Sequence, residues 1–416
     1  MKSILFLLFF FSQSVYSSSQ NATLILDEIK KSIAVEYGLQ DEFVTVEETV
    51  IEEQKINKVQ SKIDELKIKE QKRLGLPTDR VLTGAERVEL LKKKNRESIN
   101  QKKNHQVAGD WLDSKKAEVE NWQNEKLKQL KIWEDERKKF LTRVDDYKKD
   151  LTKIPEPPKE IIKKIPVKKV KKIRVEALPD SFIIEGALDL PIKDQGKRPT
   201  CASFAGVRSV EILLNQQNKY TELSEQYFYY SSKPECQTSP CSNGGSWVFN
   251  GFENSKKSSQ FDIPREKDCS YVDNPKRNNE TQIPLENGCQ RGVAKVEDYV
   301  FVKNNDAIIS ELKAGHPVIV GTKLSENFYT NKGHVFLKDA LSAGLDSHAN
   351  GHAIVFVGFI KLPQKLHASE GRFCFVTANS WGLGWGRGGH SCVSEKWFDR
   401  FKFDMNFMAL SAVKSR

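Results

Sequence analysis

The chain has 416 residues and a formal net charge of +10, with 38% hydrophobic and 29% charged residues. This length is too great for one average domain, and the hydrophobic content is too low for a chain that is globular throughout. The positive excess lies in the first part, since residues 1–178 hold 38 Lys and Arg against 30 Asp and Glu, whereas residues 179–416 hold 28 against 26. Such a basic stretch is more often a solvated surface than a nucleic-acid site, so no nucleic-acid partner is expected.

Residues 1–17 have the features of a secretory signal peptide. Lys2 supplies the positive start, Ile4 to Phe11 form an apolar run of eight residues, and Ser17 offers a small residue for cleavage. Eight residues are far fewer than the ~20 that a membrane-spanning helix needs. We therefore expect an exported protein, secreted or held in the periplasm or cell envelope, with no transmembrane anchor after the signal has been removed.

Residues 18–152 form a charged region that is predicted to be helical or coiled. Its stretch from Val46 to Asp150 is nearly free of glycine and proline. In the last helix two sets of apolar residues recur every 11 positions. The first set is Trp111, Trp122, Trp133 and Val144, and the second set is Val119, Leu130 and Leu141. Eleven residues make about three helical turns, so these side chains form a narrow stripe. The stripe is expected to cover a partner helix, the catalytic domain or another chain.

Residues 153–177 are predicted to be an extended linker. Four prolines and repeated lysines occur in this stretch, and together they prevent a packed core. Enzymes of the trypsin type could cut the linker, which would make it a processing site. It could instead bind an anionic lipid or polymer, and the sequence leaves both alternatives open.

Residues 178–416 have the composition of a globular domain. A helical pattern from Phe204 to Leu214 comes first, and three β-rich stretches follow at Val318–Val320, Ala353–Phe359 and Phe373–Ala378. A helical front followed by a β-rich back predicts an α+β domain.

All seven cysteines lie in this C-terminal domain. In an exported protein, an odd number favours one functional thiol and three bridges. Proximity in sequence suggests three disulfides, which are Cys236–Cys241, Cys269–Cys289 and Cys374–Cys392. Cys201 is then the cysteine that stays free.

Cys201 has the surroundings of a reactive thiol. Pro199 and Thr200 precede an apolar-periodic run, which sets Cys201 at a helix N-terminus, where the helix dipole favours a thiolate. A histidine partner would stabilise the thiolate further. Among the seven histidines, His352 alone begins a long apolar strand, which would hold its backbone rigidly, as a general base requires.

Two amide side chains complete this candidate site. Asn379 follows the next apolar strand, so neighbouring antiparallel strands would bring its oxygen to the imidazole of His352. Trp381 can shield that hydrogen bond from water. Gln195 can donate to a developing oxyanion together with the backbone N–H of Cys201. No metal is expected, because the glycine between His348 and His352 argues against a zinc pair on a helix, and no cofactor is expected.

The chain from Leu178 onward resembles the papain family of cysteine peptidases, and its bacterial branch in particular. The resemblance rests on Pro191 to Gly196, Leu223-Ser224-Glu225-Gln226, Asn243 to Trp247, and Asn379-Ser380-Trp381-Gly382. It implies a two-lobed fold with a cleft between a helical lobe and a β-barrel lobe. It also implies that Cys201 is the nucleophile, His352 the base, Asn379 the residue that orients it and Gln195 the oxyanion donor, with Gly244, Gly245 and Trp381 lining the substrate cleft.

The sequence departs from the usual family pattern around the nucleophile. The usual Cys-Gly-Ser-Cys-Trp is here Arg198-Pro199-Thr200-Cys201-Ala202, so one bridge cysteine and a tryptophan are missing. The usual partner of that cysteine corresponds to Cys241, which motivates its pairing with Cys236. No catalytic group is lost, but the rim of the nucleophile loop differs.

These observations predict an exported cysteine endopeptidase that acts on protein or peptide substrates through a thioester. A non-catalytic envelope or scaffold protein with a decayed peptidase domain is the alternative. Residues 18–177 could be an inhibitory pro-region, in which case the enzyme is made as a zymogen. They could instead be a permanent module that packs on the catalytic domain or on another chain.

Overall fold

The computed structural model describes residues 21–39, 102–150, 158, 161, 167, 179–233, 244–273, 289, 291–343 and 351–416. The chain divides into two compact units, of which one holds residues 1–36 and 130–416 and the other holds residues 37–129. Helix α5 (Lys102–Asp150) begins in the second unit and ends in the first. The predicted signal peptide at 1–17 lies outside the described residues, as do nearly all residues of the predicted linker at 153–177.

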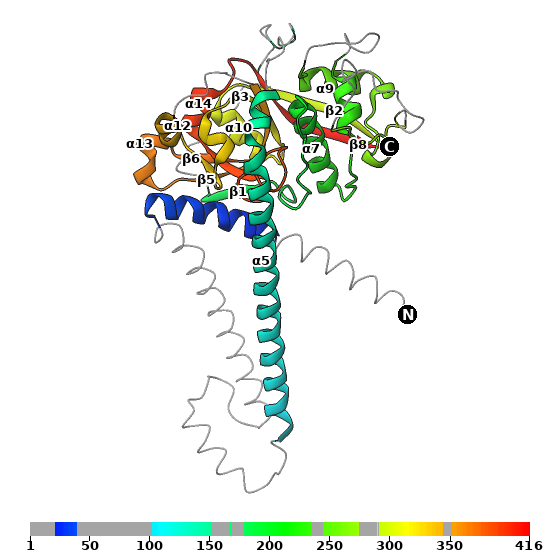
Figure 1. Ribbon diagram of the computed structural model, residues 1–416. Coiled ribbons are helices and arrows are strands. Elements are labelled where there is room, and N and C mark those ends of the chain that lie inside the picture. The colour runs from blue at the N-terminus through cyan, green and yellow to red at the C-terminus, as the bar shows by residue number, and fades with distance from the viewer. Residues whose placement is uncertain are drawn as a thin grey trace, which may run out of the picture. The chain divides into compact units, whose positions relative to one another are not determined.

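One mixed sheet organises the C-terminal part of the chain (Figure 1). Its strands are β1 (Ser181–Ile183), β2 (Ala294–Val302), β3 (Val318–Lys323), β4 (His334–Val335), β5 (Gly351–Lys361), β6 (Phe373–Ala378), β7 (His390–Ser394) and β8 (Phe407–Ser415). The strand order is β2-β8-β3-β5-β6-β7-β4, and β1 pairs with β5. Strands β5 and β6 are antiparallel, as the sequence predicts, with Val355 opposite Ala378.

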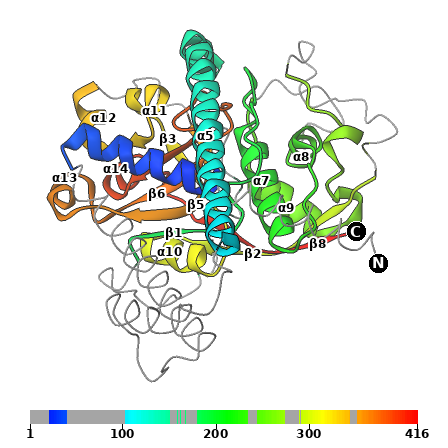
Figure 2. The same cartoon turned by 90° about the horizontal axis from the view of Figure 1, so that it is seen from below.

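Helices form a second lobe beside this sheet and also cover parts of the sheet (Figures 1 and 2). The helical lobe contains α7 (Cys201–Gln216), α8 (Glu225–Ser231) and α9 (Val248–Lys257), with the short 3-10 helices η3 (Ser259–Phe261) and η4 (Glu266–Asp268). The sheet lobe carries α10 (Asn305–Lys313), α11 (Glu326–Thr330), α12 (Leu337–Ala343), η5 (Gln364–Leu366), α13 (His367–Glu370) and α14 (Glu395–Phe401). The predicted α+β fold with two lobes is confirmed.

Helix α7 is the centre of the helical lobe. Every residue from Ala202 to Leu214 is buried, as expected of a helix that is covered on all sides. It packs against β5 of the sheet lobe and against α8 and α9. A methyl group added at Gly206 would lie 2.7 Å from the ring of Phe228, so close packing fixes the helix. The first residue of α7, Cys201, is therefore held at a defined place beside β5.

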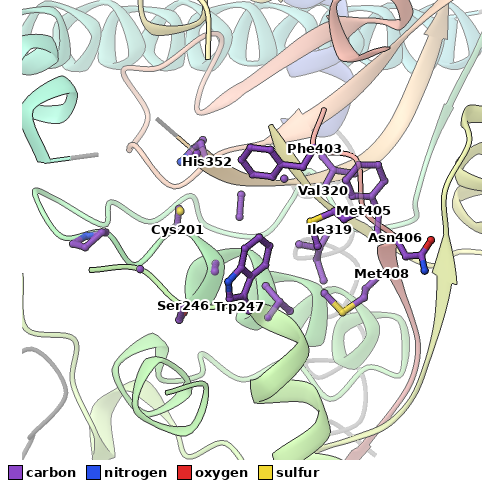
Figure 3. A pocket seen from close by; sticks show the side chains of 18 residues that line it. Cys201, Ser246, Trp247, Ile319, Val320, His352, Phe403, Met405, Asn406 and Met408 are labelled. Atoms are coloured by element: carbon purple, nitrogen blue, oxygen red, sulfur yellow. The ribbon is translucent and has the colours of Figure 1, made fainter. Parts of the chain in front are cut away.

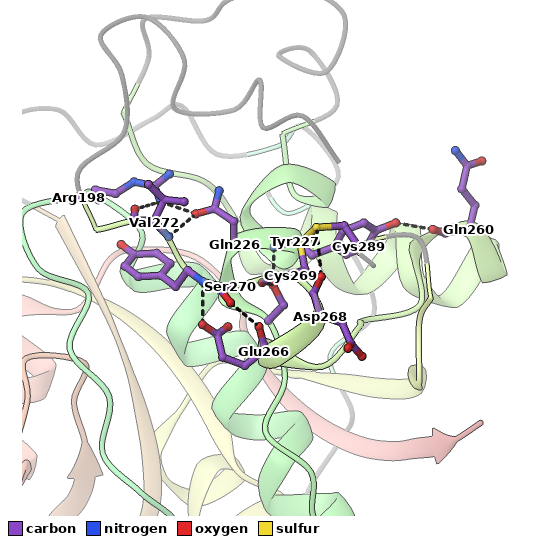
Figure 4. The surroundings of a disulfide bond; sticks show 12 residues. Arg198, Gln226, Tyr227, Gln260, Glu266, Asp268, Cys269, Ser270, Val272 and Cys289 are labelled. Carbon is purple, nitrogen blue, oxygen red and sulfur yellow. Dashed lines mark hydrogen bonds between the residues drawn. A yellow bond between two sulfur atoms is a disulfide. The ribbon is translucent and has the colours of Figure 1, made fainter. Parts of the chain in front are cut away.

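Two disulfides tie the domain together. Cys269 is bonded to Cys289 (Figure 4), and Cys374 on β6 is bonded to Cys392 on β7. These are two of the three pairings suggested by the sequence, while Cys236 and Cys241 lie outside the described residues. Cys201 is free. Among the described helices, none combines the length and the apolar character that crossing a membrane requires.

The C-terminal part of α5 packs on the same unit as the sheet. Trp133, Phe140 and Val144 are 7%, 1% and 6% exposed, and a methyl group at Gly384 would lie 2.4 Å from the carbonyl oxygen of Glu136. The apolar stripe predicted from the 11-residue period is therefore only partly buried here, because Leu141 is 42% exposed. Trp122, in the part of α5 that belongs to the second unit, is 38% exposed.

Residues 21–37 form a further helix of the first unit. Its buried residues are mostly apolar, and Ile29 and Ile33 are fully buried, while Glu28 and Ser32 are buried beside them. The hydroxyl of Ser32 lies 3.2 Å from Nδ1 of His334 on β4, which joins this helix to the edge of the sheet. Segments from the N-terminal region thus pack on the sheet lobe in two places.

Candidate active site

Cys201 lies at a cavity between the two lobes. Cys201 is the first residue of α7; it is half-buried, and its thiol is not in a disulfide. The cavity is bounded by Cys201 and Ala202 on the helical side and by His352 and Ala353 on the sheet side. Figure 3 shows Cys201 and His352 on facing walls of this cavity. The fold thus brings together the sulfur and the imidazole that the sequence singles out.

His352 is the second residue of β5, which is hydrogen-bonded on both sides. It stands opposite Thr322 of β3 and is 2% exposed. Its Nε2 lies 2.7 Å from Oδ1 of Asn379. An amide oxygen only accepts, so Nε2 carries the proton, and in a neutral ring Nδ1 is then an acceptor. Nδ1 is buried and has no hydrogen-bond partner, so this nitrogen is free to accept a proton.

Asn379 follows β6 directly, and its backbone N–H donates to the carbonyl oxygen of Gly389. Oδ1 of Asn379 also accepts from the backbone N–H of Ser380 at 2.8 Å. Two donors, Nε2 of His352 and the backbone of Ser380, therefore converge on this oxygen and fix the orientation of the amide. The imidazole is in turn held in one tautomer.

Trp381 covers the pair of His352 and Asn379. The centroids of its ring and of the imidazole are 4.5 Å apart. Trp381 is fully buried and is not among the residues that line the cavity; Tyr329 stacks on it at 5.5 Å and Phe140 of α5 at 6.2 Å. The geometry fits the predicted role as a shield for the hydrogen bond. The predicted contact of Trp381 with substrate stays a prediction, since Trp381 is not among the residues that line this cavity.

Gln195 is buried beside Ser380 and in the loop that leads to Cys201. Its Oε1 accepts from the hydroxyl of Ser380 at 2.6 Å, and its Nε2 donates to the carbonyl oxygen of Arg198 at 2.8 Å. An amide nitrogen has two hydrogens, so one N–H remains for a further acceptor. The side chain is thus fixed at both ends and retains one donor.

Burial determines the charges of the candidate pair. It lowers the pKa of His352 to about 4, an effect that the hydrogen bond to Asn379 partly offsets. Burial also raises the pKa of the Cys201 thiol, and hydrogen bonds from backbone groups, including that of Ala353, partly offset this rise. Burial thus favours the neutral form of both groups. A general base must be unprotonated, so His352 is in the form that can accept the thiol proton.

The glycine segment forms another wall of the cavity. Gly245 borders it and has a φ of +80°, which glycine adopts without strain. Gly244 does not border the cavity but lies against Pro199, whose Cγ would be 2.9 Å from an added methyl group.

Within the described ranges, no three His, Cys, Asp or Glu side chains are grouped so that they could hold a metal ion.

Sequence reasoning missed most of the apolar lining of the cavity. The additional lining residues include Trp247, Ile319, Val320, Phe403, Met405 and Met408 (Figure 3). They come from the residue before α9, from β3, from the segment before β8 and from β8 itself, so no local motif groups them. The cavity offers an apolar surface directly beside the thiol.

Comparison with known proteins identifies the family. The profile of the papain family cysteine proteases matches residues 185–407, which is more than half of the chain. The chain belongs to the papain family. Among curated relatives, ananain of Ananas comosus is 26% identical over 233 residues, which cover 55% of this chain and 59% of ananain. Falcipain-3 of Plasmodium falciparum is 25% identical over 210 residues, which cover 48% of this chain and 37% of falcipain-3.

The chain spans less than two thirds of the length of these two relatives. A solved structure of the recombinant stem bromelain precursor is 18% identical, with a TM-score of 0.44, and the match covers 59% of this chain and 74% of that chain. The segments on which the resemblance rests, from Pro191 to Gly382, lie within the matched range of 185–407.

Proposed function

We propose that this protein is an exported cysteine endopeptidase that cleaves extended protein segments through a thioester at Cys201. The observation that carries the proposal is the state of His352. Its Nε2 is engaged by Asn379, its Nδ1 has no hydrogen-bond partner, and His352 lines the same cavity as the free Cys201. This arrangement supports proton transfer from sulfur to nitrogen.

The proposed reaction has two halves, formation of a thioester and its hydrolysis, and Cys201 and His352 act in both. Nδ1 of His352 takes the proton of Cys201, and Sγ attacks the carbonyl carbon of the scissile peptide. The carbonyl oxygen becomes an oxyanion, which accepts from Nε2 of Gln195 and from the backbone N–H of Cys201. His352 then gives the proton to the leaving amine, and the C–N bond breaks to leave a thioester. Water, deprotonated by His352, attacks the thioester, and the acid product leaves as Sγ regains its proton.

The cavity supports a substrate that offers an apolar side chain beside the cut. Trp247, Val320 and Met408 lie on its walls, and burying such a side chain contributes about 1.5–3 kcal/mol.

Export is supported by the apolar run at residues 4–11 and by the two disulfides, since bridges persist in oxidising compartments.

Treatment of the full chain with a peptidyl epoxide, followed by peptide mass analysis, tests the proposal. We expect one adduct per chain, located at Cys201, and no hydrolysis of casein by Cys201→Ala. Because the cavity is open beside Cys201, labelling does not require prior processing. A chain that labels equally well after Cys201→Ala would overturn the proposal, and a labelled chain that hydrolyses no protein in reducing buffer would favour the non-catalytic alternative.

The packing of α5 supports a permanent module rather than an inhibitory pro-region, because none of its described residues lines the cavity beside Cys201. Phe140 covers Trp381, whose ring in turn covers His352 and Asn379. Substitution Phe140→Ala removes a buried contact of about 3–5 kcal/mol and should loosen this cover. We expect kcat/KM for a peptide substrate to fall by about tenfold, because the hydrogen bond that orients His352 loses part of its shield and 1.4 kcal/mol corresponds to a factor of ten.

The neighbouring residue Leu141 provides a matched control for this prediction. It lies on the same turn but is 42% exposed, so Leu141→Ala should leave kcat/KM unchanged. A rise in kcat/KM in Phe140→Ala would contradict this account and would favour an inhibitory cover, and with it production as a zymogen.

A further inference from the structure

Arg198 is a buried cation in the loop between Gln195 and the nucleophile. Its side chain is 3% exposed, which is rare for arginine unless its donors are satisfied. Nη1 donates to Oε1 of Gln226 and to the carbonyl oxygen of Val272, each at 2.6 Å (Figure 4). The guanidinium also lies 5.0 Å from the ring centroid of Tyr271, within reach of a cation–π interaction.

The same loop is held by the hydroxyl of Tyr271. This group donates to the carbonyl oxygen of Gln195 at 2.7 Å and lies 2.7 Å from Oγ1 of Thr200. A phenol has one proton, so if it donates to Gln195 it accepts from Thr200. One hydroxyl thus joins the residue that carries the oxyanion donor to the residue that precedes Cys201.

Arg198 and Tyr271 converge on both oxyanion donors of the proposed mechanism. The carbonyl oxygen of Arg198 receives Nε2 of Gln195, which fixes the side-chain donor. Thr200 accepts the first intrahelical bonds of α7 from Ser203 and Phe204, so its position sets the backbone N–H of Cys201. Neither Arg198 nor Tyr271 borders the cavity.

Arg198 and Tyr271 together are called the clamp, and the segment that supports the clamp is itself held in place. Tyr271 and Val272 follow Cys269, whose disulfide to Cys289 anchors the segment (Figure 4). The backbone N–H of Tyr271 donates to Oε1 of Glu266 at 2.7 Å, and that of Val272 donates to Oε1 of Gln226 at 3.1 Å. The clamp therefore connects a cross-linked segment to the nucleophile loop without any covalent bond to that loop.

We propose that Arg198 and Tyr271 are positioning residues that hold Gln195 and the backbone N–H of Cys201 in the geometry that binds the oxyanion. The proposal rests on the proposed function, because it concerns the same reaction. Loss of one oxyanion donor costs about 10²–10³ in kcat, and a donor that is only misplaced should cost less. Substrate binding in the apolar cavity should not change.

The substitution Tyr271→Phe in the full chain tests this. We expect kcat to fall about tenfold with KM unchanged within about twofold. Affinity for a peptide aldehyde should fall by the same factor, because its adduct with Sγ places an oxygen where the oxyanion forms. Alkylation of Cys201 by iodoacetamide should keep its rate, because that reaction forms no oxyanion.

Tyr227→Phe is the matched control. The Tyr227 hydroxyl also donates to a backbone carbonyl, that of Gln260, but it contacts neither Gln195 nor Thr200. Tyr227→Phe should lower the melting temperature about as much as Tyr271→Phe does, while its kcat stays at the wild-type value. Arg198→Lys should resemble Tyr271→Phe in kcat, since an ammonium group does not reproduce the fork of donors.

Three outcomes overturn the proposal. Wild-type kcat in Tyr271→Phe would do so, as would equal losses of kcat and alkylation rate, which indicate general damage to the site. Equal losses of kcat in Tyr271→Phe and Tyr227→Phe would also do so. These outcomes leave the proposed function intact, whereas a wild-type chain that hydrolyses no peptide overturns both.

Discussion

Substitution of His352 by alanine is expected to lower kcat/KM for peptide hydrolysis by about 10⁴–10⁶-fold, because the proton acceptor and donor of both half-reactions is removed. Unlike a contact that only binds substrate, the imidazole acts in the transition state, so the loss should appear in kcat. Steady-state kinetics on the full chain, with the fold checked by circular dichroism, measure this effect.

His367→Ala is the matched control for this substitution. Nε2 of His367 bonds to the carbonyl oxygen of Leu362 at 2.9 Å, away from the cavity. It should reduce kcat/KM by less than about twofold. A loss below about tenfold in His352→Ala would contradict its role as the base.

Substitution of Lys193 by methionine is expected to produce the largest loss of stability. Its Nζ lies 2.7 Å from Oε1 of Glu225 and 3.1 Å from Oε1 of Glu211, and these two glutamates are 2% and 1% exposed. Removing the cation leaves two carboxyl groups buried together, and breaking a buried ion pair in this way costs about 3–5 kcal/mol. Urea unfolding, followed by intrinsic fluorescence, should show this loss of unfolding free energy.

The exposed pair of Lys256 and Asp298 provides the control, since its atoms are also 2.7 Å apart but both side chains are largely in water. Lys256→Met should cost no more than about 1 kcal/mol of unfolding free energy.

The loss of stability in Lys193→Met should also depend on pH. Burial raises the pKa of Glu225 to about 8, whereas an unfolded glutamate releases its proton near 4.5. A protonated carboxyl needs no cation, so the loss should be smaller at pH 5 than at pH 8. Equal losses for the two lysine variants would contradict this account.

The sequence could predict the parts of the site that depend on one element at a time. Cys201 precedes an apolar-periodic run, and His352 and Asn379 adjoin two apolar runs that form β5 and β6. Antiparallel pairing of consecutive strands then places their ends together, which is the reason that the hydrogen bond between His352 and Asn379 could be anticipated. The roles of these residues remain predictions.

The apolar cavity and the clamp could not be predicted, because they depend on tertiary contacts between distant loops. Met405 and Met408 lie about 200 residues after Cys201, and Tyr271 lies 71 residues after Thr200. The 11-residue period of α5 did not single out Phe140, for a simpler reason. At about 100° per residue, Leu141 lies roughly 80° around the helix from Trp133, whereas Phe140 lies within about 20°. Phe140, outside the predicted stripe, is therefore the residue that packs on Trp381.

The pH dependence of the alkylation of Cys201 by iodoacetamide tests the central claim most directly. Burial lowers the pKa of His352 to about 4, so the imidazole is able to accept the thiol proton above that pH. We predict a rate constant that is level from about pH 5 to 8 and falls at lower pH, as His352 becomes protonated. In His352→Ala the rate should instead rise only near or above about pH 8.5, the value of an unassisted thiol. A wild-type profile that rises only near pH 8.5, as in the variant, would contradict the pairing of Cys201 with His352.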